Sequence, residues 1–310
     1  MTPLPLDDSV NTDPQDSPEA HAANEALAKP LAHRHAPAPG NTEGPAAYSL
    51  VARGAAELFG AFLITFGVMF TLAFSAMQQE GSVLIVALST GFMFIAATAT
   101  VAQVSGGHFF AAVTVAQGLL GRTRWADAGV YLGCQLLGSI GAAALTFALI
   151  PQGFPPLLYL ANRGELIAQG APGYGQRSPL YVASQGGAQF DMVHALVITV
   201  VASAIFVAVI VGARGRRATD SGHKCRSRWV MRQALVGGLA LVALHLLTRP
   251  VTNGGFDIGR ALGSSIFAGE GLLWQQLWVF VLAPLVGGVL AATFIKATEP
   301  SEADLPLLTA

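Results

Sequence analysis

Charged residues are scarce in this chain: only 11% of its 310 residues are Asp, Glu, Lys or Arg, whereas 53% are hydrophobic. Soluble domains carry about 25% charged residues, so the composition argues against a soluble protein and favours a membrane protein. Cysteine is also nearly absent. Cys134 lies in an apolar run and Cys225 in a basic one, which gives neither a disulfide framework nor a metal-ligand spacing. We therefore expect no metal site and no cofactor.

Residues 1–49 lack any apolar periodicity and are rich in Pro, Ala, Asp, Asn and His. This composition predicts a disordered tail. The tail also lacks a basic region followed by an apolar core, so we do not expect a signal peptide. Residues 50–298 are the predicted membrane domain, and residues 299–310 are a short second tail.

Six apolar runs are long enough to cross a bilayer, which takes about 20 residues; they lie at 50–76, 83–104, 127–150, 192–213, 229–248 and 274–296. Basic residues of the short loops gather on one side of these spans: Arg122, Arg124, seven Arg or Lys between 214 and 232, and Lys296. The other side has only Arg163, Arg177 and Arg249. The positive-inside rule then predicts a multi-pass protein of the plasma or inner membrane with both termini in the cytoplasm. The Gly- and Pro-rich connection 151–190 becomes an external loop.

Two Gly-rich segments follow the second and the fifth span. Residues 104–114 read Val-Ser-Gly-Gly-His-Phe-Phe-Ala-Ala-Val-Thr, and residues 251–261 read Val-Thr-Asn-Gly-Gly-Phe-Asp-Ile-Gly-Arg-Ala. Each is followed by a helix-compatible run that is too short to cross the bilayer. Non-helical backbone at membrane depth is tolerated only where protein buries it or where it lines a cavity. Paired broken segments of this kind indicate a solute path.

Each half of the chain thus has three spans and one broken segment. Because three is odd, the second half must run through the membrane in the opposite sense to the first. The predicted fold is therefore all-α: six transmembrane helices and two re-entrant half-helices in an inverted repeat. The half-helices should begin near Ala111 and Ile258 and point their positive N-terminal ends at each other near the midplane.

These motifs resemble the aquaporin or major intrinsic protein family over residues 50–298. The family's two pore loops read Ser-Gly-Gly-His-x-Asn-Pro-Ala-Val-Thr and Gly-x-x-Asn-Pro-Ala-Arg-Ser-x-Gly. Matching residues are Ser105, Gly106, Gly107, His108, Ala112, Val113, Thr114, Gly254, Arg260 and Gly263, with Ala56-Glu57, Gln135, Gly138, Ala283-Pro284-Leu285 and Gly287-Gly288 in the spans. The resemblance implies a passive channel for water and small uncharged polar solutes, surrounded by membrane lipid and assembled as a homotetramer. It implies no enzyme activity and no nucleic-acid partner.

The centre of both motifs departs from the family pattern. Asn-Pro-Ala is replaced by Phe110-Ala111-Ala112 in the first loop and by Asp257-Ile258-Gly259 in the second. In the family each Asn caps its half-helix and points an amide donor into the pore. Asp257 can still cap a helix, but an ionised carboxylate only accepts hydrogen bonds, and Phe110 can do neither. We predict an atypical pore centre.

The resemblance also assigns the selectivity filter, carried over by spacing, to Thr90, His245, Gly254 and Arg260. His245 lies fifteen residues before Arg260, as in the family. Thr90 stands where water-selective members have a bulky aromatic residue, so we expect a widened filter. The residues assigned to bracing the loops are Glu57, His108 and His194, the last in the place of a second glutamate, with Asp191 as a competitor for that role.

Several interpretations stay open at this stage. Phe110 is either a hydrophobic constriction or a ring turned into neighbouring helices. Asp257 is either a helix cap or a cation-attracting site, and Arg260 either lines the pore or pairs with Asp257. Two alternative functions follow: a cation- or proton-permeable pore through Asp257, and a non-conducting structural or interaction member of the family. No set of nucleophile, base and orienting group indicates an enzyme.

Overall fold

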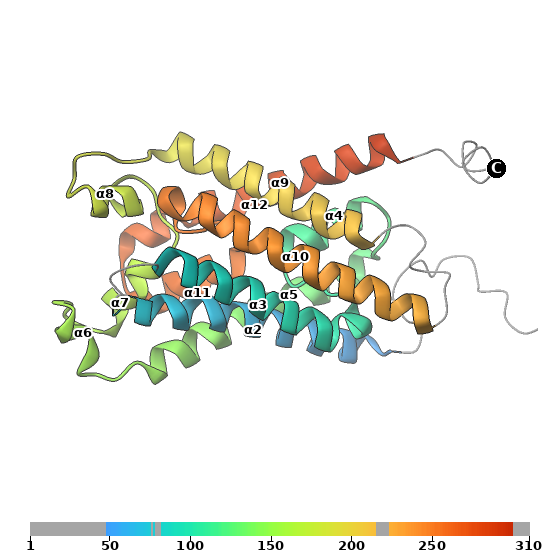
Figure 1. The fold of residues 1–310 in the computed structure, drawn as a ribbon, viewed down its shortest axis with the longest axis horizontal. Helices are drawn as coiled ribbons and strands as arrows, with labels where there is room; N and C mark the ends of the chain where they lie inside the picture. The colour runs from blue at the N-terminus through green and yellow to red at the C-terminus, as the bar shows by residue number, and fades with distance from the viewer. Residues whose placement is uncertain (1–47, 76, 78–81, 215–222, 300–310) are drawn as a thin grey trace, which may run out of the picture. The chain divides into compact units, whose positions relative to one another are not determined.

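The computed structural model describes residues 48–75, 77, 82–214 and 223–299, without the side chains of residues 223–226. Residues 1–47 and 300–310, which make up nearly all of the two predicted tails, lie outside the described part of the chain, as do residues 215–222 of the basic loop. They are the grey trace in Figure 1.

Within the described residues, six long apolar helices match the predicted spans (Figure 1). They are α2 (Leu50–Ser75), α3 (Ser82–Ser105), α5 (Trp125–Leu149), α9 (Met192–Arg214), α10 (His223–Thr252) and α12 (Gly271–Thr298). Their lengths of 23 to 30 residues suffice to cross a bilayer. The predicted end of α10 at residue 248 was too early. The helix continues through Pro250, whose ring removes one backbone hydrogen bond close to the helix end, where little helix remains to be disrupted.

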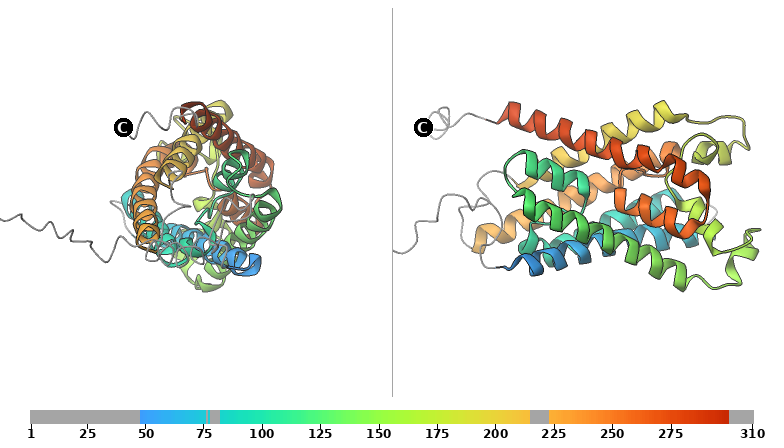
Figure 2. Two further views of the ribbon diagram at one scale, coloured as in Figure 1. Left: turned by 90° about the vertical axis from the view of Figure 1, so that its right-hand side faces the viewer. Right: turned by 180° about the vertical axis from the view of Figure 1, so that it is seen from behind.

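Two short helices lie beside the long ones at opposite ends of the bundle (Figure 2). They are α4 (Ala111–Leu119) and α11 (Ile258–Ala268), which are the two predicted half-helices. Helix α4 packs chiefly on α12, and α11 chiefly on α5. With 9 and 11 residues they are too short to cross a bilayer. The predicted combination of six spans and two half-helices is confirmed.

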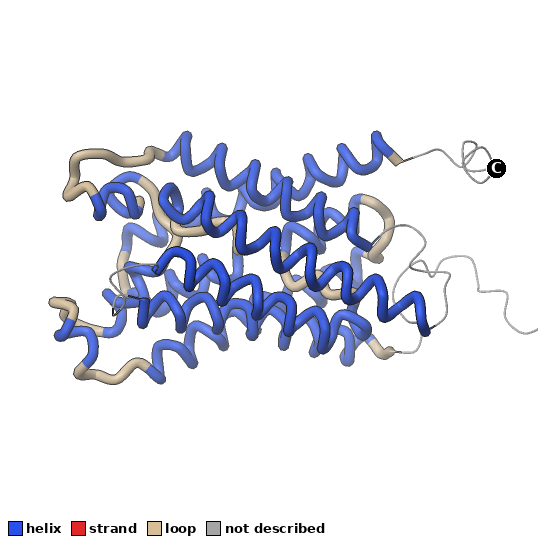
Figure 3. The backbone as a smooth tube through the Cα atoms, viewed as in Figure 1, coloured by secondary structure: helices blue, strands red, loops and turns tan. Residues whose placement is uncertain are grey.

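The long connection between α5 and α9 folds into short helical pieces (Figure 3). These are α6 (Phe154–Leu157), α7 (Arg163–Gly170), η2 (Gly175–Arg177) and α8 (Pro179–Ala183). Asn162 caps α7 by accepting the N–H of Glu165, and α7 packs on α11. We call this end of the bundle the loop end. The opposite end, with Arg122, Arg124, Arg214 and Lys296, is the basic end.

The inverted repeat is visible where α3 crosses α10. The crossing is made by two glycines: a β-carbon on Gly91 would lie 2.6 Å from the carbonyl oxygen of Gly238, and one on Gly238 would lie 2.8 Å from that of Gly91. Only residues without a side chain allow two helices to approach this closely. Gly91 and Gly238 are therefore equivalent positions, and counting from them pairs Ser105 with Thr252.

The same relation holds for the two remaining helix pairs. A β-carbon on Gly138 of α5 would overlap the carbonyl of Leu58 in α2, and one on Gly287 of α12 would overlap that of Val200 in α9. Leu58 therefore corresponds to Val200. It follows that Glu57 in the first half corresponds to Thr199 in the second.

The buried core lies between the helices at the level where both re-entrant segments end. It includes Phe109, Phe110 and Phe256 from the two loops, together with side chains of α2, α3, α4, α9, α10 and α12. Large apolar side chains on the outer helix faces are exposed; Leu137 and Phe294, for example, are 63% and 64% accessible. Such an outer surface suits contact with lipid.

Candidate functional site

The first re-entrant loop is held by a buried carboxylate. Gly106, Gly107 and Phe109 have positive φ angles, which turn the chain from the end of α3 into the core of the bundle. This turn leaves backbone N–H groups without helix partners. Glu57, which is fully buried, accepts the N–H groups of His108 (3.0 Å) and Phe109 (2.7 Å). Gln135 donates to the same carboxylate at 2.8 Å, so Glu57 has the geometry that its predicted bracing role requires.

His108 connects this loop to α4 and to the end of α9. Its Nε2 lies 3.3 Å from Nη1 of Arg214, and its Nδ1 lies 3.2 Å from Oγ1 of Thr114. Because arginine only donates, Nε2 must be the acceptor and Nδ1 carries the proton that goes to Thr114. Thr114 in turn donates to the carbonyl of Phe110. The ring of His108 is buried against Tyr131, with the ring centres 5.2 Å apart.

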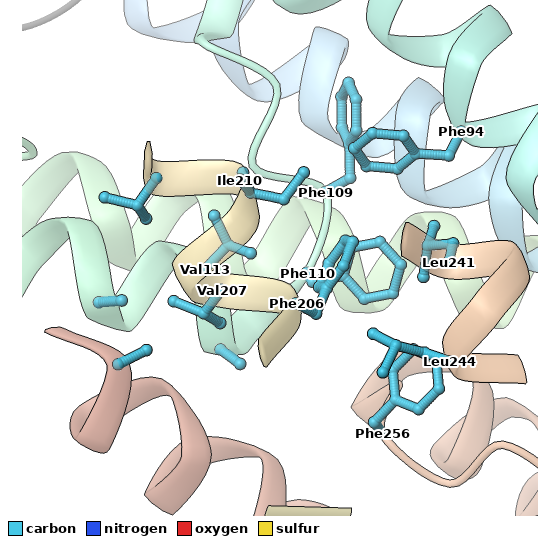
Figure 4. Packing of buried hydrophobic residues seen from close by; sticks show 14 of the residues in the cluster. Phe94, Phe109, Phe110, Val113, Phe206, Val207, Ile210, Leu241, Leu244 and Phe256 are labelled. Carbon is cyan, nitrogen blue, oxygen red and sulfur yellow. The ribbon is translucent and has the colours of Figure 1, made fainter. Parts of the chain in front are cut away.

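Phe110 precedes the first residue of α4 and provides no side-chain cap. Its ring is buried and makes an edge contact with Phe206 of α9, with ring centres 4.9 Å apart; Phe94 of α3 lies at 6.4 Å (Figure 4). The ring is thus turned toward neighbouring helices, within the core between the two loops. Ala111 follows as the first residue of the half-helix, and the next residue, Ala112, is buried.

Asp257 has the corresponding place before α11 and does cap its helix. Its Oδ1 accepts the N–H groups of Gly259 (3.0 Å) and Arg260 (3.3 Å). Ile258 begins the helix. Gly259 lies where α5 comes close, because a β-carbon there would overlap the side chain of Ser139. Within the described part of the chain, the side chains of Asp257 and Arg260 form no direct salt bridge, and Asp257 instead accepts the backbone N–H of Arg260.

Arg260 is held by backbone carbonyls. Its side chain is buried, with 1% of the residue accessible. Nη1 donates to the carbonyl of Gly170 at 3.0 Å, and Nη2 donates to the carbonyls of Asn253 (2.7 Å) and Gly254. Gly170 is the last residue of α7, so the negative end of that helix faces the guanidinium. Carbonyl dipoles make the direct contacts with the buried charge.

Three of the four predicted filter residues come together at the loop end. A β-carbon on Gly254 would lie 3.1 Å from Nε2 of His245 and 3.4 Å from Nη2 of Arg260. Nδ1 of His245 lies 3.2 Å from the carbonyl of Leu241 and donates to it. Nε2 is then an acceptor, and it has no partner in the described structure. The fourth residue, Thr90, is buried on α3, where its hydroxyl donates to the carbonyl of Val86.

His194 does not have the predicted bracing position. It lies near the start of α9 with its side chain 60% exposed, and its Nδ1 is 2.8 Å from Oδ1 of Asp191. Asp191 accepts the N–H groups of Val193 and His194 and so caps α9. Hydrogen bonds from His194 lower the pKa of the Asp191 carboxyl. The position equivalent to Glu57 is Thr199, five residues further along the helix.

Other residues of the site were not found from the sequence. Phe256 makes an edge contact with His245 (ring centres 5.1 Å apart) and lies 6.4 Å from Phe206. It thereby joins the filter to the central aromatic cluster of Figure 4. The available signal was its equivalence to Phe109 in the repeat, one residue before each half-helix cap. Asn253 was also missed; its amide donates to the carbonyls of Gln169 and Ala171 and ties this loop to α7.

Comparison with known proteins gives consistent matches. The family model described as "Major intrinsic protein" matches residues 47–295. Proteins named "Aquaporin Z" are 32% identical: that of Photorhabdus laumondii over 243 residues (76% of this chain and 92% of the relative), and that of Brucella melitensis over 245 residues (78% and 95%). The crystal structure of the aquaglyceroporin from Plasmodium falciparum has a similar fold. Its TM-score is 0.65 at 18% identity, over 81% of this chain and 97% of the other.

Proposed function

The chain belongs to the major intrinsic protein family of membrane channels for water and small solutes, and on this premise we propose that it passes water and small uncharged polar solutes through a pore with an atypical centre and a widened filter. The observation that carries the proposal is the grouping of Arg260, His245 and Gly254 beside the second re-entrant loop. The guanidinium offers donors and Nε2 of His245 offers an acceptor, which suits hydroxyl and carbonyl groups of neutral solutes.

A wide filter is supported by the small residues at two of its four positions. Gly254 has no side chain, and Thr90 directs its hydroxyl to its own helix. No bulky ring is present at either position, so a polyol could pass beside Arg260 where a narrower filter admits only water. Phe256 contacts His245 from the side of the core, so its ring bounds the filter at its inner end.

The atypical centre consists of Phe110 and Asp257 at the two half-helix caps. Neither supplies the amide donor that the family's Asn places there, so a passing oxygen must rely on the N-terminal field of the half-helices. The rings of Phe94, Phe110 and Phe206 make the surroundings apolar. Dewetting of such a region provides a natural gate.

The proposal is tested by stopped-flow light scattering of proteoliposomes, with water, glycerol and urea as permeants. Wild-type vesicles should exceed protein-free vesicles for water and for at least one solute. A second membrane protein reconstituted at the same density controls for vesicle leak. Rates equal to those of the control for every permeant would contradict the proposal.

A second candidate function is a cation- or proton-permeable pore through Asp257. It is favoured by one feature: both hydrogen bonds of Asp257 use Oδ1, and the residue is only partly buried. Planar-bilayer currents in wild type that disappear in Asp257→Asn would support it, because Asn caps equally well and lacks the charge. No current in either protein removes this candidate.

The third candidate is a non-conducting family member, and the burial of Phe110 between Phe94 and Phe206 favours it. If this packing closes the path, Phe110→Ala should create water flux that wild type lacks. Equal flux in both proteins would contradict closure at Phe110.

For the assembly and placement we propose a homotetramer in the plasma or inner membrane with the basic end in the cytoplasm. Support comes from the exposed apolar outer faces and from Arg122, Arg124 and Lys296 at the end where both termini leave the bundle. Residues 50–298 form the channel domain in this proposal, flanked by cytoplasmic tails. Mass measurement in lipid nanodiscs and protease access to each tail test these points.

A further inference from the structure

A second histidine–arginine pair lies at the basic end, opposite His245 and Arg260. Arg214 is the last residue of α9, and its Nη1 lies 3.3 Å from Nε2 of His108. Its guanidinium carbon lies 5.4 Å from the centre of the Trp229 ring, within cation–π range. A β-carbon on Gly106 would overlap the guanidinium. Arg214 therefore lies directly on the first re-entrant loop, where glycine leaves room for it.

The repeat places this arginine at the same backbone that Arg260 contacts in the other half. Counting from the Gly91–Gly238 crossing pairs Gly106 with Asn253 and Gly107 with Gly254. Arg260 donates to the carbonyls of Asn253 and Gly254. The equivalent carbonyls of Gly106 and Gly107 accept from the amide of Gln233 at 3.2 and 2.9 Å. In each loop, one side chain donates to the carbonyls of the two equivalent residues: Gln233 in the first loop and Arg260 in the second. A guanidinium also lies against the first residue of each pair, that of Arg214 at Gly106 and that of Arg260 at Asn253.

The charge of Arg214 is not neutralised by a carboxylate within the described part of the chain. The residue is half-buried, and of its five N–H donors the structure pairs one with His108. Gln233 satisfies the loop carbonyls without adding charge, so Arg214 leaves this end of the path positive. Among the described residues no other acceptor is bound by this guanidinium, so its remaining donors can bind a solute that carries hydroxyl or carbonyl oxygens.

We propose that Arg214, positioned by His108 and Trp229, forms a second selectivity constriction at the basic end of the pore. It repels cations there and binds neutral solutes through its free N–H groups. The inference rests on the proposed function, since it assumes that one path passes both re-entrant loops. The pore then has a cationic constriction at each mouth, in series.

Two barriers in series predict a specific pattern of leak. Arg214→Gln alone should leave cation flux nearly unchanged, because Arg260 still blocks the path. Arg260→Val, which copies the equivalent residue Val113, removes the other barrier. The double variant should leak K⁺ at least tenfold faster than Arg260→Val alone, because a unit charge about 4 Å from a cation, at an effective dielectric constant of about 20, is worth more than the ~1.4 kcal/mol to which tenfold corresponds. Potassium flux into dye-loaded proteoliposomes measures this, with water flux recorded in parallel.

The matched control is Arg228→Gln, which removes an exposed charge next to Trp229. Combined with Arg260→Val it should not increase the leak. Arg214→Lys should keep the barrier, and Trp229→Leu should weaken it partly by freeing the guanidinium. A double variant that leaks no faster than Arg260→Val, or no faster than the Arg228 control, would overturn the proposal. Arg214 would then serve only as one of the basic residues that orient the protein in the membrane.

A second measurement is independent of conduction. In detergent, a variant with Trp229 as its sole tryptophan (Trp125, Trp274 and Trp278 changed to Phe) is quenched by iodide and by caesium. The ratio of the iodide quenching constant to the caesium quenching constant should fall several-fold with Arg214→Gln and should be retained with Arg214→Lys. If wild type carries no water, the proposed function fails, whereas this ratio still shows whether Arg214 makes the basic end positive beside Trp229. An unchanged ratio in Arg214→Gln would overturn the inference.

Discussion

In the first re-entrant segment the backbone N–H groups of His108 and Phe109 are bound by the carboxylate of Glu57, whereas in the second segment the backbone carbonyls of Asn253 and Gly254 are bound by the guanidinium of Arg260. The first segment is therefore braced by a negative side chain from a long helix. The second is braced from within, by its own half-helix, with α7 supplying a further carbonyl. The two loops therefore keep the same backbone course, although a negative side chain stabilises the first and a positive side chain stabilises the second.

The half-helix starts differ in the same way. Asp257 caps α11 with two hydrogen bonds, while Phe110 gives α4 no cap and is instead stabilised by ring contacts with Phe206 and Phe94. The two equivalent half-helices thus begin in different ways, one with a polar cap and one with apolar ring packing. The comparison yields predictions that separate the two halves.

The largest effect is expected at the Glu57–Thr199 pair. Glu57→Ala leaves two buried N–H groups without an acceptor and removes one of the two acceptors of the Gln135 amide, at about 1–3 kcal/mol for each unsatisfied group. Thr199→Val should cost nothing or stabilise slightly, because the buried hydroxyl has no partner in the described structure. Thermal unfolding in detergent, followed by circular dichroism, measures both. Equal shifts in the two variants would contradict the assigned asymmetry.

A smaller effect is expected where the half-helices contact the long ones. Gly259→Val places a branched side chain against Ser139 and should destabilise the protein by roughly 1–3 kcal/mol through overpacking. Ala112→Gly, at the equivalent residue, should cost about 1–2 kcal/mol, because it adds backbone entropy to the unfolded chain and removes a buried methyl group. Water flux should fall with Gly259→Val, since α11 must move. A stable and fully conducting Gly259→Val would show that this contact is looser than described.

The helix cap gives the next prediction. Asp257→Ala should destabilise by about 1 kcal/mol, whereas Asp257→Asn should be nearly neutral because Asn caps equally well. Phe110→Asn tests the opposite half: the new cap offsets part of the lost ring packing, so it should unfold at a higher temperature than Phe110→Ala. The reverse order would mean that the α4 start cannot use a side-chain cap.

The smallest effect concerns the start of α9. Since hydrogen bonds with His194 lower the pKa of Asp191, its contribution to stability is present above the ordinary pKa of about 3.9 and is lost as the pH falls through the lower folded value. Asp191→Asn should therefore lower stability slightly at neutral pH, and this difference from wild type should disappear as the pH falls through the folded pKa of Asp191. A difference that appears only at low pH and is absent at pH 7 would contradict this.

The sequence predicted those parts of the fold that depend on local composition. Apolar run length gave the six spans, and Gly-rich interruptions gave the two half-helices. The resemblance supplied Glu57 and the filter, of which His245, Gly254 and Arg260 do lie together. His194 was misassigned because Thr199 carries no charge to mark it in an apolar run. The contacts of Arg260 with Gly170 and of Phe110 with Phe206 join distant segments, and no local pattern predicts them.

The most direct test compares water and glycerol flux in proteoliposomes of wild type and Thr90→Phe. The account predicts that wild type passes both permeants faster than protein-free vesicles do. The added ring should reduce glycerol flux strongly and water flux little, because it narrows the opening beside Arg260. Flux of neither permeant in wild type would contradict the channel, and equal reduction of both in Thr90→Phe would contradict the widened filter.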